Sequence, residues 1–286
     1  MRLKKGTRII HPKKPEWGMG EILQISNNEE VRVFFANEGE KKILLKYVDL
    51  KGLPPEEAVH PMLDNLKDSP ELSDTKYLSF AKGLDHFLTQ FPDGFHGDRF
   101  MDTERKTKMD AHLLGSELLG KEKLEDLIAS GEYWQVCEYA KKVINKTNLI
   151  FPNEKTALKT AIETEAAQEA FAKNLYELLY SEDDVKERFT TFAKHLERIN
   201  AAKWTLATYF LYIMFPEKYI FVKPTVSQNA ANLSRFELHF KTKLNWQTYE
   251  AAMTYAKYLH KSLDAADNAP RDMMDIQAFI WSIAKA

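Results

Sequence analysis

Three charged residues stand at a spacing that could support hydrolysis of a phosphodiester bond. Asp93 follows a proline, and Glu104 and Lys106 come shortly afterwards in a Glu-x-Lys pattern. Two carboxylates can hold a magnesium ion while a lysine polarises the attacking water, so one hypothesis is a metal-dependent nuclease acting on nucleic acid. Such elements usually lie on neighbouring strands, whereas residues 101–108 are polar and typical of a helix. The alternative is a charged helix start with Asp102 as its cap.

Other catalytic signatures are incomplete. Gly115, Gly120 and Lys121 nearly complete a phosphate-binding loop, but Glu122 replaces the Ser or Thr that would hold magnesium. No His-Glu-x-x-His motif occurs, and no Cys or His pair has zinc spacing. The single cysteine, Cys137, excludes an intrachain disulfide and is interpreted as a small buried hydrophobe rather than a nucleophile. We therefore expect no cofactor and no metal, and the pattern leans away from an enzyme.

A second group of polar residues lies beside apolar segments near the C-terminus. Lys223 stands alone in an apolar run, where it is either a functional cation or a surface lysine at a turn. Arg271, Asp275 and Gln277 adjoin an apolar helix and could form a buried polar network or a binding site. The alternative is a helix cap made by Asp272 with structural ion pairs around it.

The elements that must position these residues are mostly helices. The most apolar stretch, 204–215, has Thr205 and Thr208 as its only polar residues. A helix that is apolar on all sides is buried in a core or spans a membrane, and this one ends at Pro216, too early to span. We expect a central buried helix, then an extended segment at 219–222. The helices predicted from residue 74 onward are 74–90, 103–119, 121–129, 132–146, 154–162, 165–180, 183–199, 203–215, 226–239, 246–263 and 272–284.

Residues 4–53 favour strands instead. The expected strands are 6–10, 21–25, 31–35 and 42–45, separated by Gly, Pro and Asn turns. Four or five short strands within about 50 residues are typical of a small SH3-like barrel. The sequence thus predicts an α+β protein with a small N-terminal SH3/Tudor-like β-barrel followed by a large all-α domain. The expected boundaries are 1–54 for the barrel, 55–73 for a linker with a short helix at 55–66, and 74–286 for the α-helical domain.

The N-terminal sequence also resembles a short bacterial domain of unknown function. The resemblance rests on the run His-Pro-Lys-Lys-Pro-Glu-Trp-Gly-Met-Gly at 11–20, the strand at 31–35 and the Gly-Glu-Lys-Lys turn at 39–42. That domain is itself similar to the Tudor/SH3-like RNA-polymerase-interaction barrels of bacterial transcription and repair proteins. The resemblance implies a barrel fold and a partner in the transcription or DNA-repair machinery.

A barrel of this kind would bind through one face. We expect the binding residues to be Lys13, Lys14, Trp17, Arg32, Lys41 and Lys42. Two alternatives stay open at this point: the tryptophan packs into the barrel core, and the cations form an ordinary solvated face.

Charge and composition restrict the function only loosely. The net charge is −2, so no global basic field indicates nucleic acid. The blocks at 204–210, 221–224, 245–249 and 270–281 resemble uncharacterised bacterial helical proteins, which implies no activity. The sequence favours a cytoplasmic, non-enzymatic adaptor that links a nucleic-acid or protein partner on the barrel to a second partner on the helical domain, with no membrane contact. The alternatives are an enzyme acting on nucleic acid and an oligomeric scaffold, and the oligomeric state is open.

Overall fold

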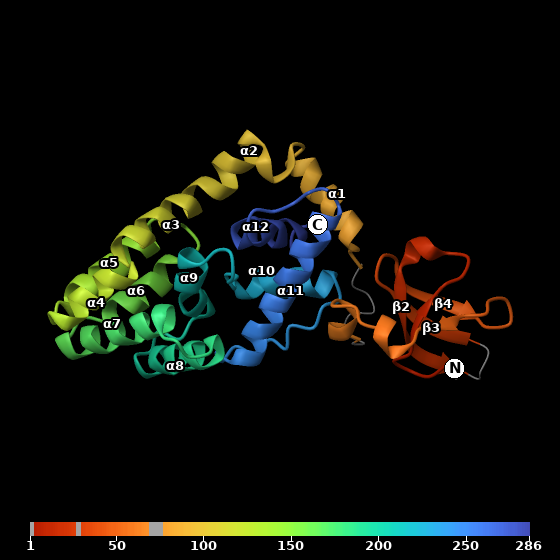
Figure 1. The fold of residues 1–286 in the computed structure, drawn as a ribbon, viewed down its shortest axis with the longest axis horizontal. Helices are drawn as coiled ribbons and strands as arrows, with labels where there is room; N and C mark the ends of the chain where they lie inside the picture. The colour runs from red at the N-terminus through yellow and green to blue at the C-terminus, as the bar shows by residue number, and fades with distance from the viewer. Residues whose placement is uncertain (1–2, 27–29, 69–76) are drawn as a thin grey trace.

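The chain has an α+β architecture in which a small sheet precedes a long run of helices. A computed structural model describes residues 3–26, 30–68 and 77–286. Figure 1 shows the sheet at one end of an elongated molecule and the helices filling the rest. The predicted fold class, a small β domain followed by an all-α region, is confirmed.

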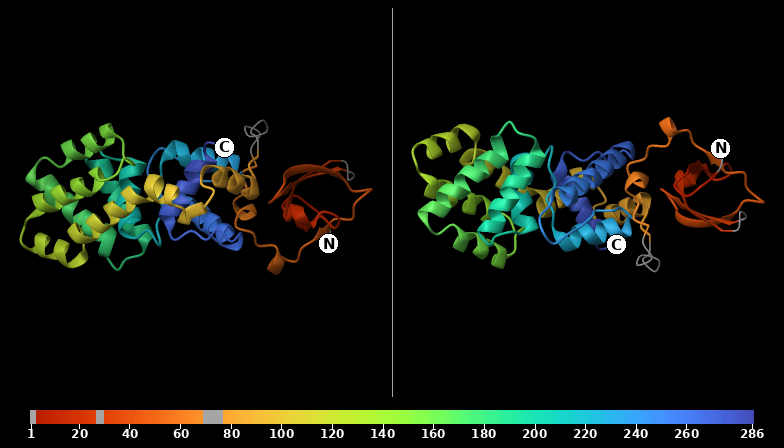
Figure 2. Two further views of the ribbon diagram at one scale, coloured as in Figure 1. Left: turned by 90° about the horizontal axis from the view of Figure 1, so that it is seen from above. Right: turned by 90° about the horizontal axis from the view of Figure 1, so that it is seen from below.

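The N-terminal sheet has five antiparallel strands in the order β4-β3-β2-β1-β5. Their bounds are Arg8–Ile10 (β1), Met19–Ser26 (β2), Glu30–Phe35 (β3), Gly39–Leu44 (β4) and Lys51–Gly52 (β5). Alternate apolar residues point to one side of the strands because side chains alternate along a β-strand. The core that they form contains Ile9, Ile22, Val31, Val33, Phe35, Ile43 and Leu50. Figure 2 shows how strongly this sheet curls around its core.

The linker is less helical than expected. In place of one helix over 55–66 the structure has two single-turn 3₁₀ helices, Pro55–Glu57 and Leu63–Asn65. Pro61 explains the interruption, because proline offers no N–H to a helix and restricts the residue before it to extended geometry. The linker is instead held by the helical region. Leu66 pairs with Phe236 in an isolated antiparallel bridge.

The helices largely follow the predicted ranges. Their bounds are Phe80–Gln90 (α1), Asp98–Phe100 (α2), Lys106–Leu118 (α3), Lys121–Ala129 (α4), Tyr133–Asn145 (α5), Pro152–Ala161 (α6), Glu165–Tyr180 (α7), Val185–Arg198 (α8), Trp204–Met214 (α9), Pro224–Leu233 (α10), Trp246–Ala265 (α11) and Met273–Ile283 (α12). The start expected at residue 74 lies outside the described residues. The prediction of a helix to residue 239 is wrong, because Arg235 and His239 adopt positive φ, which breaks helical geometry.

The central helix α9 is buried along its whole length, as predicted. All of its residues are removed from water, and α3, α7 and α8 pack around it. Figures 1 and 2 show α3 to α9 gathered in one half of the helical region, with α1, α10, α11 and α12 in the other half next to the sheet. Within the described parts of the chain, no helix combines the length and the apolarity needed to cross a membrane.

The sheet packs on the helical region through a small apolar cluster. Its buried members are Leu23, Phe34, Ala36, Met62 and Leu63. Tyr77 completes the contact: its ring centroid lies 4.9 Å from that of Phe34, and its hydroxyl donates to the Ala36 carbonyl at 2.5 Å. Gly39 makes room for this ring, since a Cβ there would lie 2.5 Å from it. The two parts of the chain are therefore fitted to each other.

A histidine is buried in α8. His195 is 2 % exposed, and its ring lies 6.2 Å from that of Phe171 and 6.5 Å from that of Phe192. Its Nε2 has no hydrogen-bond partner among the described residues. Burial lowers the pKa of His195, because the charged ring would lose its hydration, and Arg198 lowers the pKa further. The ring is therefore neutral in the folded protein at neutral pH.

This burial makes stability sensitive to acid. The unfolded chain holds the His195 proton with a pKa near 6.5 and the folded chain holds it less tightly, so the free energy of unfolding should decrease as the pH falls below that value. We expect the free energy of unfolding, measured by urea denaturation, to decrease between about pH 7.5 and about pH 5.5. His195→Leu should remove part of this pH dependence. The exposed His96 supplies the control. If His96→Leu and His195→Leu change the pH dependence equally, the explanation is wrong.

Candidate functional site

The basic residues predicted on the sheet do not all share one face. Lys13 and Lys14 are exposed in the loop after β1, where Lys14 pairs with Glu16 at 3.3 Å. Arg32 on β3 and Lys41 on β4 line a groove elsewhere on the sheet. Lys13 and Lys14 do not line that groove.

Trp17 belongs mainly to the sheet core. The indole is partly buried and packs against that core, with its ring centroid 5.0 Å from His11 and 5.1 Å from Phe35. The Lys41 ammonium lies 5.5 Å from the centroid of the indole. This geometry favours the packing interpretation of Trp17, while one part of the ring remains beside a cation.

The cations of the strands line a groove between the sheet and the helical region, which we call the junction groove. It has a volume of about 860 Å³. Its cations are Lys5, Arg32, Lys41, Lys42, Lys67 and Arg235, and its carboxylates are Glu38, Glu40 and Asp68. Six positive and three negative groups leave an excess of three positive charges. The sequence prediction contained Arg32, Lys41 and Lys42. It missed Lys5, Lys67 and Arg235, because they come from the residues before β1, from the linker and from the segment after α10.

Ion pairs link many of these charges. Arg32 Nε lies 2.6 Å from Glu40 Oε1, Lys41 Nζ lies 2.9 Å from Glu38 Oε1, and a third pair joins Lys5 to Asp68 at 3.4 Å. The Arg32 guanidinium lowers the pKa of Glu40, chiefly by hydrogen bonding to the carboxylate. All three pairs are substantially exposed, and exposed pairs contribute only about 0–1 kcal/mol each. The cations of these pairs can therefore turn from the protein carboxylates to an anionic group of a ligand at small cost.

Arg235 lies at the helical side of the junction groove. It follows α10 with a φ of 57°, and its backbone carbonyl accepts a hydrogen bond from Lys67 N at 2.8 Å. Burial lowers the pKa of Arg235, while Glu40 and Asp68 act in the opposite direction. A partly desolvated cation gains more from an added anion than a fully hydrated one does. The groove thus combines excess positive charge with incomplete solvation.

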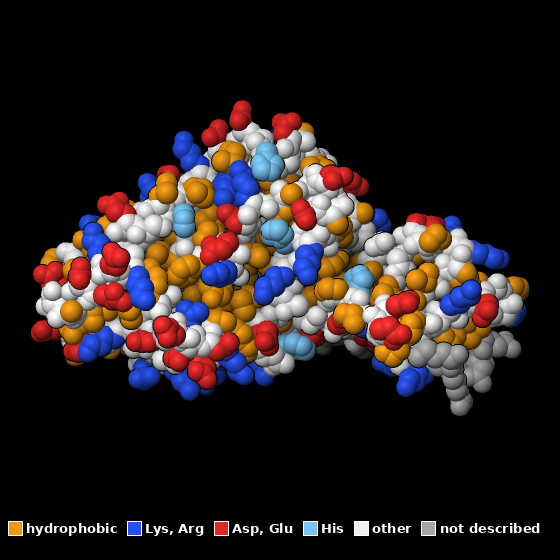
Figure 3. Space-filling view, viewed as in Figure 1, with side chains coloured by type: hydrophobic (Ala, Val, Ile, Leu, Met, Phe, Trp, Pro, Cys, Tyr) orange, Lys and Arg blue, Asp and Glu red, His pale blue; other side chains and the backbone are white. Residues whose placement is uncertain are grey.

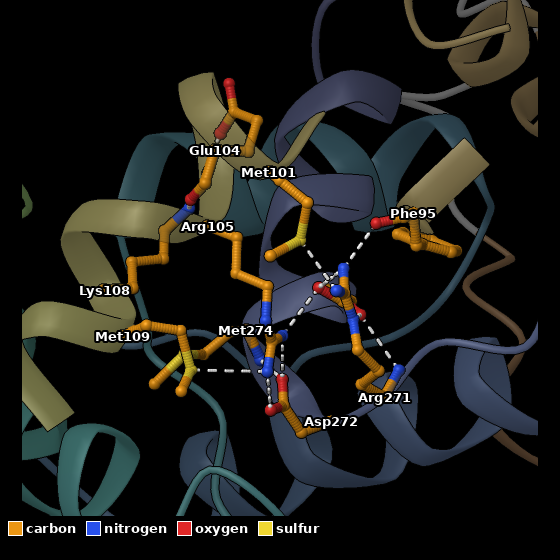
Figure 4. Close-up of polar contacts among 10 residues, drawn as sticks. Phe95, Met101, Glu104, Arg105, Lys108, Met109, Arg271, Asp272 and Met274 are labelled. Atoms are coloured by element: carbon orange, nitrogen blue, oxygen red, sulfur yellow. Dashed lines mark hydrogen bonds and ion pairs between the residues drawn. The ribbon is translucent and has the colours of Figure 1, made fainter. Parts of the chain in front are cut away.

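The three candidate nuclease residues lie along one stretch of irregular and helical chain. Asp93 is exposed before a 3₁₀ helix at Gly94–His96, Glu104 lies in a π-helical turn, and Lys106 is exposed at the start of α3. In Figure 4 the Glu104 side chain is directed away from Arg271 and Asp272. Across the described residues, no group of three or more His, Cys, Asp or Glu is placed to hold a metal ion. The nuclease hypothesis stays a prediction without a described metal site.

The C-terminal polar residues do form a network, and its centre was not predicted. Arg105 Nη1 donates to Asp272 and to Asp275, each at 2.8 Å, and its side chain is 7 % exposed. Arg271 donates to Asp275 at 2.9 Å through both its backbone N–H and its Nε, and its Nη2 donates to the Phe95 carbonyl. Figure 4 shows these groups converging from the π-helical turn before α3, from the start of α12 and from the 3₁₀ helix after α1. Gln277 is buried in α12.

A π-helical turn places Arg105 in this network. The turn spans Met101–Arg105 and leads directly into α3, so it rotates the arginine towards the start of α12. Asp272 serves as the N-cap of α12, as predicted, and accepts from Met274 N at 2.8 Å. Lys108, one turn further, donates to the Glu104 carbonyl, and burial lowers its pKa although Glu104 acts against that change. The network therefore connects the two halves of the helical region.

Lys223 holds the loop before α6 in place. Its Nζ donates to the Leu149 carbonyl at 3.1 Å and lies 3.7 Å from the centroid of the Phe151 ring. Trp281 of α12 lies on another side, with its ring centroid 5.7 Å from the ammonium. Burial lowers the pKa of Lys223, and Glu154 acts against that change. These contacts favour a structural role at the start of α10.

The buried network makes a stability prediction. Arg105→Met removes the arginine that pairs with Asp272 and one of the two arginines that pair with the buried Asp275, and breaking a buried pair costs about 3–5 kcal/mol. We expect urea denaturation to show a decrease of that size in the free energy of unfolding. Arg99→Met, which removes an exposed arginine from the preceding turn, should cost less than about 1 kcal/mol. Equal losses in the two variants would contradict a stabilising network.

Comparison with known proteins bears on the sheet alone. No curated protein and no solved structure matches the chain significantly. The predicted likeness to a short domain of unknown function is confirmed, while the further likeness to polymerase-interaction barrels stays a prediction. Residues 3–53 match the family described as "Protein of unknown function (DUF3553)", so the N-terminal sheet of this chain is a domain of that family.

Proposed function

We propose that the protein is a non-enzymatic adaptor that binds the sugar–phosphate backbone of a nucleic acid in the junction groove. The observation that carries the proposal is the excess of three positive charges in a hollow of about 860 Å³ between the sheet and the helical region. The net charge of the chain is −2, and Figure 3 shows acidic and basic side chains interspersed over the face in view. A local concentration of cations stands out against this background.

The groove suits phosphate better than a neutral ligand. Lysine and arginine supply most contacts to nucleic-acid backbones, and such contacts carry affinity without sequence information. Lys42 takes part in no ion pair among the described residues, and Lys67 Nζ donates to the neutral amide oxygen of Asn232 at 3.0 Å. Both ammonium groups therefore retain donors for a phosphate. The exposed pairs of Arg32 and Lys41 add two more cations that can be redirected.

The adaptor role follows from the arrangement of the two parts. The nucleic acid occupies the seam between the sheet and the helices, which leaves the remaining surface of the helical region for a second partner. The partner chemistry expected from the sequence, the transcription or DNA-repair machinery, is consistent with a chain that holds nucleic acid without cutting it.

Salt-dependent binding tests the proposal. Fluorescence anisotropy with labelled duplex and single-stranded DNA should show affinity that falls linearly with the logarithm of salt concentration. The double variant Lys42→Ala, Lys67→Ala should weaken binding to both probes and lower the slope by about one unit per lysine. Circular dichroism establishes that the variant remains folded.

A matched control removes the same charge elsewhere. Lys13→Ala, Lys14→Ala takes away two lysines that do not line the junction groove, and it should leave the slope nearly unchanged. Equal effects of the two double variants would show that binding is not located in the groove. Absence of binding at low salt, or binding to polyglutamate but not to DNA, would rule out a nucleic-acid ligand.

A further inference from the structure

A second groove lies along α11, on the helical region, and shares no residue with the junction groove. We call it the α11 groove; its volume is about 690 Å³. The apolar residues that line it are Val185, Tyr219, Trp246, Met253 and Met273. Met253 and Met273 are 8 % and 5 % exposed, so they belong mainly to the core and present only a small part of their flexible side chains to the groove. The aromatic rings of Tyr219 and Trp246 add rigid contact area.

The charges around the α11 groove are ordered along the helix. Glu250 stands in the first half of α11, while Lys257 and Lys261 follow on the same face, one turn apart, in the second half. Lys218 at another edge is paired with Glu217 at 3.8 Å. The groove therefore has a negative group near the start of α11 and an excess of positive charge near its end.

We infer that the α11 groove binds an amphipathic helix of a partner protein, antiparallel to α11, with acidic residues in its first turns and a basic residue near its end. In this orientation the acidic turns lie against Lys257 and Lys261, and the basic end lies against Glu250. Acidic side chains are also favoured at helix N-termini and basic ones at C-termini, because they compensate the helix dipole. The charge order of the groove and the intrinsic preference of a helix thus agree for the antiparallel orientation only.

The backbone chemistry of the groove favours a helix over an extended peptide. The long wall of the groove is α11, and the backbone N–H and C=O groups in the middle of a helix bond within that helix. An extended ligand would find no strand edge to pair with there. A helical ligand satisfies its own backbone and presents apolar side chains at positions i, i+3, i+4 and i+7 to the floor.

This inference rests on the proposed adaptor function, which assigns a second partner to the helical region. It adds the chemistry of that partner. The two can fail separately, because one concerns DNA at the junction groove and the other concerns a peptide at the α11 groove. DNA binding that persists when the α11 groove is altered, with peptide binding abolished, would separate them directly.

The test is selection from a display library of helical peptides on the full-length protein. The library keeps leucine at i, i+3, i+4 and i+7 and randomises the remaining positions. Enriched peptides should carry Asp or Glu in their first turns and Lys or Arg near their ends. Their affinity should fall about tenfold or more for the variant Lys257→Glu, Lys261→Glu, because like charges then face each other. Reversing the charges of the peptide should restore binding to that variant.

Two further variants complete the design. Thr254→Arg fills the middle of the α11 groove from a half-buried surface position without touching the core, and it should abolish binding. Lys142→Glu, Lys159→Glu makes the same charge change at exposed positions outside the groove and should leave binding intact. Absence of enrichment, or enriched peptides that bind all variants equally, would overturn the inference. So would sedimentation that shows a dimer converted to monomer by Thr254→Arg, because the occupant would then be a second copy of this chain.

Discussion

The burial of α9 is the constraint on which the helical region depends. A helix with no polar face must be covered on every side, because any exposed side would place apolar side chains in water. The neighbouring helices are therefore packed around it. Two polar side chains of α9 help to fix where those neighbours lie. Tyr209 donates to the Val143 carbonyl on α5 at 2.8 Å, and Thr208 accepts from Val222 N at 3.0 Å. Buried polar groups need partners, and these partners hold α5 and the start of α10 in position.

Sequence reasoning succeeds where the signal is local. Apolar patterning identified α9 and the strand residues Val31, Val33 and Phe35, because burial of alternate or continuous apolar residues is a local signal. The cap at Asp272 was predictable for a similar reason, since its partner lies two residues away. Residues that act with their sequence neighbours can be assigned from the sequence.

Residues that act across long separations could not be assigned in this way. Arg105 meets Asp275 only because a π-helical turn rotates it, and nothing in the stretch Met101–Lys108 separates such a turn from an ordinary charged helix. The junction groove has the same origin: β4 contributes Lys42, the linker contributes Lys67, and the segment after α10 contributes Arg235. Its charge excess exists only after the chain has folded, so the sequence predicted cations without predicting where they gather.

The bridge between Leu66 and Phe236 has a mechanical consequence. Together with Tyr77 on Phe34, it ties the linker and the sheet to the helical region. When two binding sites are joined by a flexible linker, the linker length sets the effective concentration of one ligand near the other. A linker that permits many arrangements lowers that concentration. Two ligands on a stiff frame are held at one distance and one angle. An adaptor built this way would act as a ruler, selecting partners whose own geometry matches the spacing of its two grooves.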